Sequence, residues 1–103
     1  MLHDHPANDN EDAAVALPAA RNGQHCLEAI DWSYTLDPNG GGLDVYFGDA
    51  EDPDWSVDIT HSGPGTFPFG QGLYAPRGSD VRIVLRAGGV GNHGKLNVRL
   101  KEY

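Results

Sequence analysis

The sequence contains a single cysteine, Cys26, among its 103 residues. One cysteine cannot form an internal disulfide, so the chain does not belong to the small secreted domains that disulfides hold together. The simplest origin is therefore a cytosol, which includes particles assembled in one. Cys26 is expected to be buried and structural, because free cysteine often packs as a small hydrophobic side chain. His25 beside it would point to the opposite face of a strand, which argues against a catalytic pair.

Long apolar runs are also absent, since the longest extend over only a few residues. A membrane-spanning helix needs about 20 predominantly apolar residues, so no membrane contact is expected. The first residues, Met1 to His5, carry an acid where a signal peptide would carry its basic region. We therefore expect no signal peptide.

Basic residues are scarce in the first sixty positions, where Arg21 stands against thirteen acids. Residues 61–103 hold six basic residues against two acids, and the whole chain has a net charge of −8. An acidic domain of this kind is not expected to bind nucleic acid by neutralising phosphates. The uneven charge supports two interpretations. It serves solubility and internal cross-strand ion pairs, or an acidic end meets the basic end of a neighbouring copy.

A helical period of 3.6 residues is missing after residue 24, and a period of two replaces it. Turns rich in glycine, proline and aspartate separate the alternating segments. Strands that are apolar on one side need a second sheet to cover them. The predicted fold is all-β, a small antiparallel β-sandwich of the jelly-roll or immunoglobulin-like kind. Its predicted core is Ile30, Trp32, Val45, Phe47, Val57, Ile59, Val81, Ile83, Leu85, Leu96 and Val98.

The first alternating segment contains one irregularity. Cys26, Ile30 and Trp32 fall on the same face by alternation, and Glu28 is then a charged residue on that apolar face. The prediction places Cys26 with the other two on the core side.

Residues 1–23 are predicted to form an extended N-terminal arm, and residues 24–103 the β-sandwich domain. The stretch from His3 to Asp12 is polar, acidic and without apolar periodicity, and Pro18 opposes a helix through the mildly apolar stretch that follows. We expect the arm to have little regular structure and to contact a neighbouring molecule more than its own sandwich.

No pattern points to a catalytic or metal centre. The acids of residues 49–54 suit a solvated loop, with a weak calcium site as the alternative. His25, His61 and His93 lack the spacing of a strand-borne metal site, and the His3 and His5 pair lies in the arm. A serine beside His61 is not in a nucleophile elbow. We expect no catalytic residue, no metal and no cofactor, and hence no enzyme.

The tracts Ser62–Phe69 and Gly78–Val98 resemble small β-sandwich structural proteins of tailed bacteriophages. Such proteins often carry an apolar strand, an Ala-Gly-Gly-rich loop and then the residues Gly-Lys-Leu-Asn-Val, which here are 94–98. The resemblance covers about residues 30–100. It implies a head-decoration, head–tail or minor tail component of a virion, assembled in the host cytoplasm, without activity or cofactor.

The expected partners are other copies of the chain or neighbouring capsid or tail proteins. Surface ion pairs are individually weak, so an interface also needs an apolar centre. Four aromatic residues lie off the main core alternation or beside prolines, and charged strand faces flank them. The candidate interface residues are Tyr46, Phe67, Phe69, Tyr74, Arg82, Arg86 and Arg99. The strand faces that carry Arg82, Arg86, Lys95, Arg99 and Lys101 are expected to oppose those that carry Asp44 and Asp58 between copies.

Two other functions remain open. A carbohydrate- or cell-surface-binding module would need an exposed aromatic platform, for which Trp32, Tyr34, Tyr46, Trp55 and Tyr74 are the candidates. An acidic inhibitor that mimics nucleic acid would fit the sequence pI of about 4.7, although the C-terminal half is basic.

Overall fold

The computed structural model describes residues 2–6, 11–19 and 23–103, with the backbone alone for residues 2–6. Within these residues the chain forms eight strands and no helix, and hence none able to cross a membrane. The strands are β1 (Leu2–Pro6), β2 (Ala13–Leu17), β3 (His25–Tyr34), β4 (Gly41–Phe47), β5 (Trp55–Ile59), β6 (Gly65–Tyr74), β7 (Val81–Leu85) and β8 (Gly94–Glu102).

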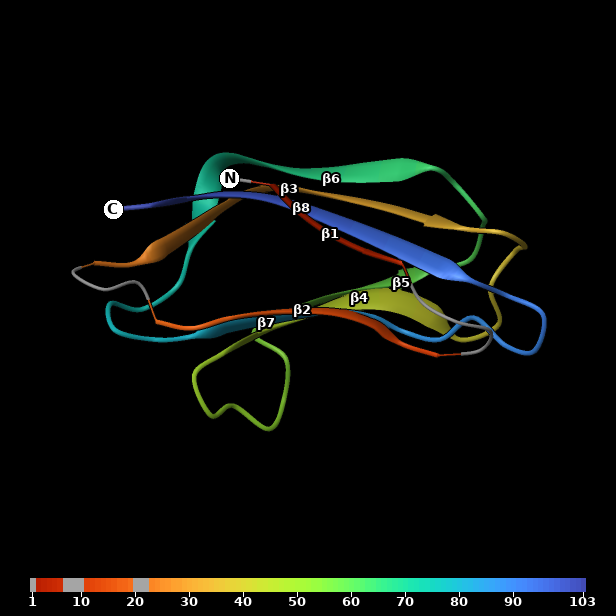
Figure 1. Cartoon of the computed structure of the whole chain (residues 1–103), viewed down its shortest axis with the longest axis horizontal. Helices are drawn as coiled ribbons and strands as arrows, with labels where there is room; N and C mark the ends of the chain where they lie inside the picture. Colours follow the sequence, from red (N-terminus) through yellow and green to blue (C-terminus); the bar gives the residue numbers. More distant parts are fainter. Residues whose placement is uncertain (1, 7–10, 20–22) are drawn as a thin grey trace.

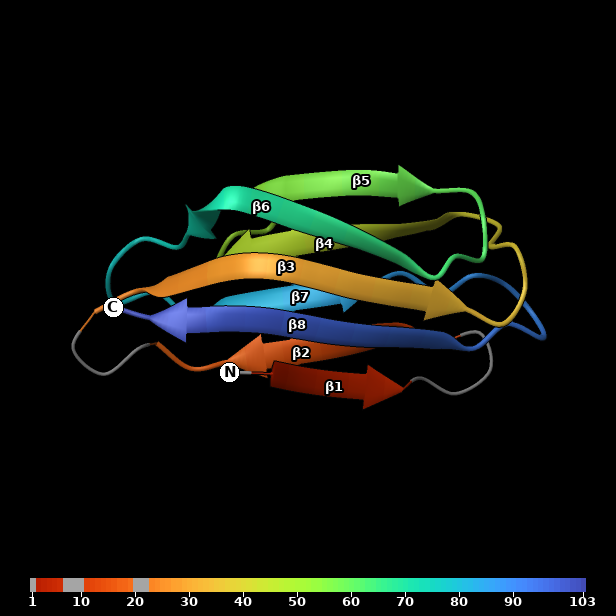
Figure 2. The same ribbon diagram turned by 90° about the horizontal axis from the view of Figure 1, so that it is seen from above.

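The strands make two four-stranded antiparallel sheets packed face to face (Figures 1 and 2). Sheet A has the order β1-β8-β3-β6 and sheet B the order β2-β7-β4-β5. Apart from the β4–β5 hairpin, successive strands alternate between the sheets. This eight-stranded order is a jelly roll. The predicted antiparallel sandwich is confirmed, and of its two kinds the jelly roll is the one that forms.

The core lies between the sheets and follows the predicted alternation. In β7, for example, Val81, Ile83 and Leu85 are buried while Arg82 is exposed. Nine of the eleven predicted core residues are fully buried, and Phe47 and Val57 pack against the core half-buried. Further buried core residues are Ala13, Val15, Leu17, Leu27, Tyr34, Leu43, Ala75 and Leu100.

The N-terminal segment contributes one strand to each sheet. Leu2–Pro6 pairs with β8 and Ala13–Leu17 pairs with β7. Ala13, Val15 and Leu17 point into the core, whereas Ala14 and Ala16 face outward. The expectation of little regular structure in residues 1–22 is therefore wrong for these two stretches. Residues 1, 7–10 and 20–22 of the predicted arm lie outside the described residues.

A β-bulge in β3 changes the face on which Cys26 lies. The register of β3 shifts between Leu27 and Ala29 against both of its neighbours, which leaves Glu28 as the extra, exposed residue. Leu27 therefore points into the core, and Cys26 faces outward, outside the core cluster. Cys26 is buried, as predicted, but its predicted position beside Ile30 is wrong because of the bulge.

A buried asparagine, Asn92, joins two loops at one end of the sandwich. Its Oδ1 accepts hydrogen bonds from the Leu36 N–H at 3.1 Å and the Thr35 hydroxyl at 3.2 Å. Its Nδ2 donates to the Leu36 carbonyl at 2.9 Å. These bonds satisfy a side chain that burial would otherwise destabilise, and they fix the loop after β3 to the loop before β8.

Candidate functional site

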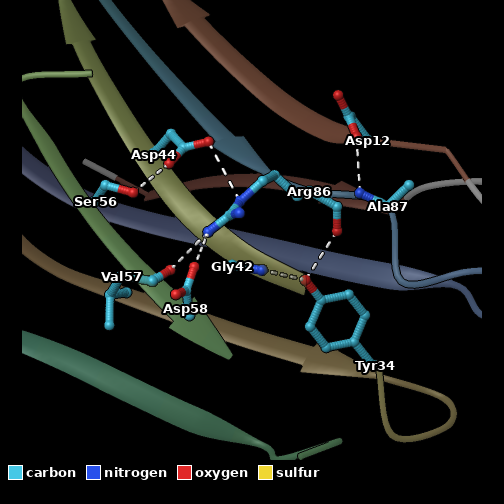
Figure 3. A network of polar contacts seen from close by, with 9 residues as sticks. All are labelled: Asp12, Tyr34, Gly42, Asp44, Ser56, Val57, Asp58, Arg86 and Ala87. Atoms are coloured by element: carbon cyan, nitrogen blue, oxygen red, sulfur yellow. Dashed lines mark hydrogen bonds and ion pairs between the residues drawn. The ribbon is translucent and has the colours of Figure 1, made fainter. Parts of the chain in front are cut away.

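On the outer face of sheet B, Arg86 is the centre of a polar network (Figure 3). Its Nη2 donates to Asp58 Oδ1 at 2.8 Å and to the Val57 carbonyl at 3.2 Å, and its Nε lies 3.4 Å from Asp44 Oδ2. The hydroxyl of Ser56 donates to Asp44 Oδ1 at 2.6 Å. The hydrogen bond to Asp58 raises the pKa of the Arg86 guanidinium above its ordinary value. Because Asp44 is only 8% exposed, this charge compensates a buried carboxylate.

Tyr34 connects this network to sheet A. The Tyr34 hydroxyl donates to the Arg86 carbonyl at 2.8 Å and accepts from the Gly42 N–H at 3.2 Å. Burial raises the pKa of the Tyr34 phenol above its ordinary value. A side chain at Gly42 would collide with the Arg86 guanidinium, so glycine is required there for close approach. Asp12 Oδ1 accepts from the Ala87 N–H at 2.7 Å, and the network therefore also fixes the chain just before β2.

Tyr46 lies further along the same face and is covered by an arginine. The Arg82 guanidinium carbon is 4.2 Å from the centroid of the Tyr46 ring. The two residues are register partners on β4 and β7, so their side chains emerge side by side. Such a cation–π contact leaves less of the ring available to another molecule.

The acidic loop of residues 48–54 projects from sheet B on the side away from sheet A (Figure 1). One of its carboxylates, Asp54, accepts the Phe47 N–H at 2.8 Å and so holds the loop to β4. Asp49, Glu51 and Asp52 are exposed. In the described part of the chain, no three side chains of His, Cys, Asp or Glu come together to hold a metal ion.

The outer face of sheet A has separate ion pairs instead of one network. Asp31 Oδ1 accepts from the Thr66 hydroxyl at 2.6 Å and from Arg99 Nη2 at 3.2 Å. Further along, Lys101 Nζ lies 3.7 Å from Glu28 Oε1. Each pair links β3 to β8 at the surface, where solvent screens it.

Two hollows open on this face of sheet A. The first, called the polar hollow, has a volume of about 470 Å³ and lies where β3, β8 and the start of β6 meet. Its Asp31 and Thr66 already bond to each other, and Lys95 lies at its margin. Its remaining lining residues are Trp32, Ser33, Pro64, Gly65 and Asn97.

The second hollow, called the tyrosine hollow, lies at the other end of β3 and has a volume of about 340 Å³. Tyr74 and Tyr103 line it and are 47% and 56% exposed, with ring centroids 5.8 Å apart and planes tilted by 36°. Interaction with the Cys26 thiol raises the pKa of the Tyr74 phenol above its ordinary value. Gly72 has a φ of +92°, and a side chain there would collide with Cys26. The Gly72 backbone and the Cys26 thiol therefore lie close together beside the Tyr74 ring.

An aromatic cluster lies where the edge strands β5 and β6 of the two sheets approach each other. Trp55 contacts Phe67 and Phe69 edge-on, with centroid distances of 5.7 and 5.1 Å. Phe67 also stacks at 6.3 Å on Trp32, which is buried. The cluster extends the core to this side of the sandwich while leaving Phe67 and Phe69 half-exposed.

The residues around His61 have structural contacts. The His61 ring lies 5.2 Å from the Trp32 ring, and the Ser62 N–H donates to Asp37 Oδ1 at 2.9 Å. The Ser62 carbonyl accepts the Tyr34 N–H at 2.9 Å. These bonds fix the loop before β6 against the end of β3.

The predicted interface residues do not form one surface. Arg82 and Arg86 share the outer face of sheet B with Asp44 and Asp58, so the expectation that they oppose those acids from another face is wrong. Phe67 and Phe69 lie together on β6, and Tyr74 lies in the tyrosine hollow. Arg99 is on sheet A. Tyr103 was missed, because no alternation continues past the last strand to predict its face.

Comparison with known proteins shows the fold. No family model matches the chain, and no curated protein matches its sequence. A chain in the acidic stable capsid structure of Helicobacter pylori bacteriophage KHP30 is similar in structure, with a TM-score of 0.53 and 16% identity over 100% of this chain and 88% of that one. The CBM36-1 domain of a multidomain xylanase from the hindgut metagenome of Trinervitermes trinervoides has a TM-score of 0.50 and 13% identity over 90% of this chain and 73% of that one.

Proposed function

We propose that this chain is a non-enzymatic structural protein of a virion, a phage capsid decoration or tail component that binds other copies of itself or neighbouring capsid or tail proteins. Jelly rolls are common in viral capsids and in lectins. The similarity to a phage capsid chain over the whole of this chain supports the first of these contexts. The proposal places the protein in the virion, assembled in the host cytoplasm, without direct contact to nucleic acid or membrane.

The observation that carries the proposal is the division of charge between the two outer faces. Among the described side chains, the face of sheet A carries Lys95, Arg99 and Lys101 against Glu28 and Asp31. The face of sheet B with loop 48–54 carries two cations, Arg82 and Arg86, against six carboxylates. The basic face of one subunit is therefore complementary to the acidic face of the next, which favours head-to-tail stacking.

The apolar centre of this contact is proposed at the β6 edge of sheet A. Phe67 and Phe69 are half-exposed there, and Tyr46 adds a smaller contact on sheet B. Pro68, between Phe67 and Phe69, has no N–H to donate, so the β6 edge resists the addition of another strand. Neighbouring molecules would then contact side chains instead of extending the sheet. The predicted role of residues 1–22 in contacts with a neighbouring molecule stays a prediction.

Sedimentation velocity of the purified chain tests the proposal. At low salt and high protein concentration we expect reversible association that weakens when salt is raised to about 0.5 M, where the screening length falls to a few ångströms. The double variant R99E/K101E should weaken association about tenfold, and so should D49K/D52K on the opposite face. Combining all four changes should restore it, because the complementarity is then reversed and intact.

R77E is the matched control, because Arg77 is exposed in the loop between β6 and β7, away from both sheet faces. It should leave association unchanged. Two results contradict assembly through these two faces. One is a chain that stays monomeric at low salt, and the other is a quadruple variant that does not regain association.

A further inference from the structure

Exposed aromatic side chains are concentrated in the tyrosine hollow. Of the described residues, the exposed large hydrophobic side chains are Leu36, Tyr74, Val90 and Tyr103. The two tyrosines adjoin each other over a hollow, whereas Leu36 and Val90 lie in loops at the other end of β3 and before β8. Each ring is about half exposed, so one part of it packs against the protein and the rest faces solvent. Aromatic rings in this state are typical of binding surfaces.

The platform is rigid beneath the rings. The Tyr103 backbone exchanges two hydrogen bonds with Gln24, of 2.8 and 2.9 Å, which extend the β3–β8 pairing to the chain's last residue. Tyr74 is a register partner of the buried Cys26, and the Gly72 backbone lies against the same thiol. A preformed site of this kind loses little conformational entropy when a ligand binds.

Polar groups surround the platform on both sides. Glu28 and Lys101 form a 3.7 Å ion pair and remain 44% and 62% exposed, so each retains hydrogen-bonding capacity. Gln71 adds an exposed amide from β6. The site thus offers a carboxylate acceptor, an ammonium donor and an amide around two flat apolar surfaces, with no net charge from the pair.

We infer that the tyrosine hollow is a binding site for an oligosaccharide. A pyranose ring has a flat apolar face that packs on a tyrosine ring, and hydroxyls at its rim that bond to carboxylate, ammonium and amide groups. Single-stranded nucleic acid would need an excess of cations, which Glu28 removes here. Tyr74 then serves a ligand and not a neighbouring subunit. The site shares Lys101 with the charged face proposed for assembly, but the inference rests on the two tyrosine rings, which the assembly proposal does not use.

The structure also reduces the possible aromatic platforms to one. Trp32 and Tyr34 are buried in the core, Tyr46 is covered by Arg82, and Trp55 is packed against two phenylalanines. Of these five aromatic residues, Tyr74 is the one with an exposed ring beside polar groups. Tyr103 supplies the second ring that such a platform needs.

The test is a glycan array of neutral and acidic bacterial and plant oligosaccharides, probed with the labelled full chain. The strongest ligand is then titrated into ¹⁵N-labelled protein. We expect amide shifts confined to residues 26–28, 70–74 and 101–103. Y74A and Y103A should each lower affinity about tenfold or more. Y46A, which removes a tyrosine from the opposite face, should bind like the unchanged protein.

Thermal unfolding of the three variants separates loss of the site from loss of the fold, and Y103F keeps the ring if Y103A proves unstable. Absence of any array signal overturns the inference. Amide shifts that map to the polar hollow or to sheet B also overturn it. So does binding to control peptides on the array without binding to any glycan. None of these outcomes bears on self-association, so the assembly proposal is judged separately by sedimentation.

Discussion

The two outer faces of the sandwich carry the same types of side chain in different arrangements. On sheet B, Arg86 bonds to Asp58 and to a backbone carbonyl, and it neutralises the nearly buried Asp44. On sheet A, Arg99 and Asp31 are 51% and 35% exposed and form a single surface pair. Tyrosines differ in the same way, since Tyr46 is covered by Arg82 while Tyr74 is open.

The difference shows that residue type alone does not determine whether a charged side chain bonds within the protein or stays exposed to solvent. Arg86 follows a buried strand, and the absence of a side chain at Gly42 lets it fold back over β4. Arg99 has a strand on each side, and its guanidinium extends toward solvent. On sheet B, Arg86 therefore serves the fold by compensating Asp44, whereas Arg99 on sheet A remains half-exposed.

The largest expected effect tests whether β2 belongs to sheet B as a core strand. V15D places a carboxylate among buried apolar residues and should destabilise the protein by about 3 kcal/mol or more. A16D, one residue further along on the outer side, should change stability by less than about 0.5 kcal/mol. Urea unfolding followed by tryptophan fluorescence measures both. Equal effects from the two variants would mean that β2 has no buried side.

The next effect compares the arginines of the two faces directly. R86M leaves Asp44 buried without its cation and should cost about 2 kcal/mol. R99M removes a pair between exposed groups and should cost less than about 1 kcal/mol. Chemical denaturation at one pH and salt concentration gives both values. An R99M loss as large as that of R86M would abolish the distinction between the faces.

Y34F sharpens the comparison by removing the connection from sheet A to the network. A buried and a partly buried hydrogen bond lose their shared hydroxyl, and the expected cost is about 1–2 kcal/mol. Because burial raises the pKa of Tyr34 in the folded state, its contribution is fully present below the ordinary phenol value of about 10 and is lost as the pH rises through the higher folded value. The difference in unfolding free energy between Y34F and the unchanged protein should therefore be smaller above pH 10 than at pH 8. A difference that stays the same at both pH values would contradict this prediction.

The smallest effect concerns Arg82. R82Q removes the cation above the Tyr46 ring and should cost about 0.5–1 kcal/mol, the range for exposed cation–π contacts. Thermal unfolding gives the difference, and V84T beside it serves as a surface control. A loss comparable to that of R86M would extend the structural network of sheet B over its whole outer face.

The β-sandwich was predictable because alternation in the later strands is strong. Val81, Ile83 and Leu85 alternate with Arg82, Val84 and Arg86, and such a pattern buries mainly one face. The strand β2 was missed for a physical reason, since its outward residues Ala14 and Ala16 are as apolar as its inward ones in a simple alternation test. Polar contrast, on which the prediction depends, is absent there.

The network and the tyrosine hollow were beyond reach of the sequence because they depend on strand order. Arg86 meets Asp44 and Asp58 only because β7 lies beside β4 and β4 beside β5. Tyr74 and Tyr103 lie close together because β6 and β8 flank β3 and run in the same direction, so both strands end beside the start of β3. Several topologies satisfy the same alternation, and each would pair different residues.

The bulge at Glu28 has a consequence for insertions and deletions in the gene. Side chains on a strand alternate, so losing one codon normally transfers every residue on one side of the deletion to the opposite face. Glu28 is the extra residue in β3, and Leu27 and Ala29 already occupy opposite faces. An in-frame loss of the Glu28 codon would yield a regular strand with Cys26 and Leu27 on their present faces. Position 28 is thus the place in β3 where the loss of one residue preserves the alternation of side chains between the two faces.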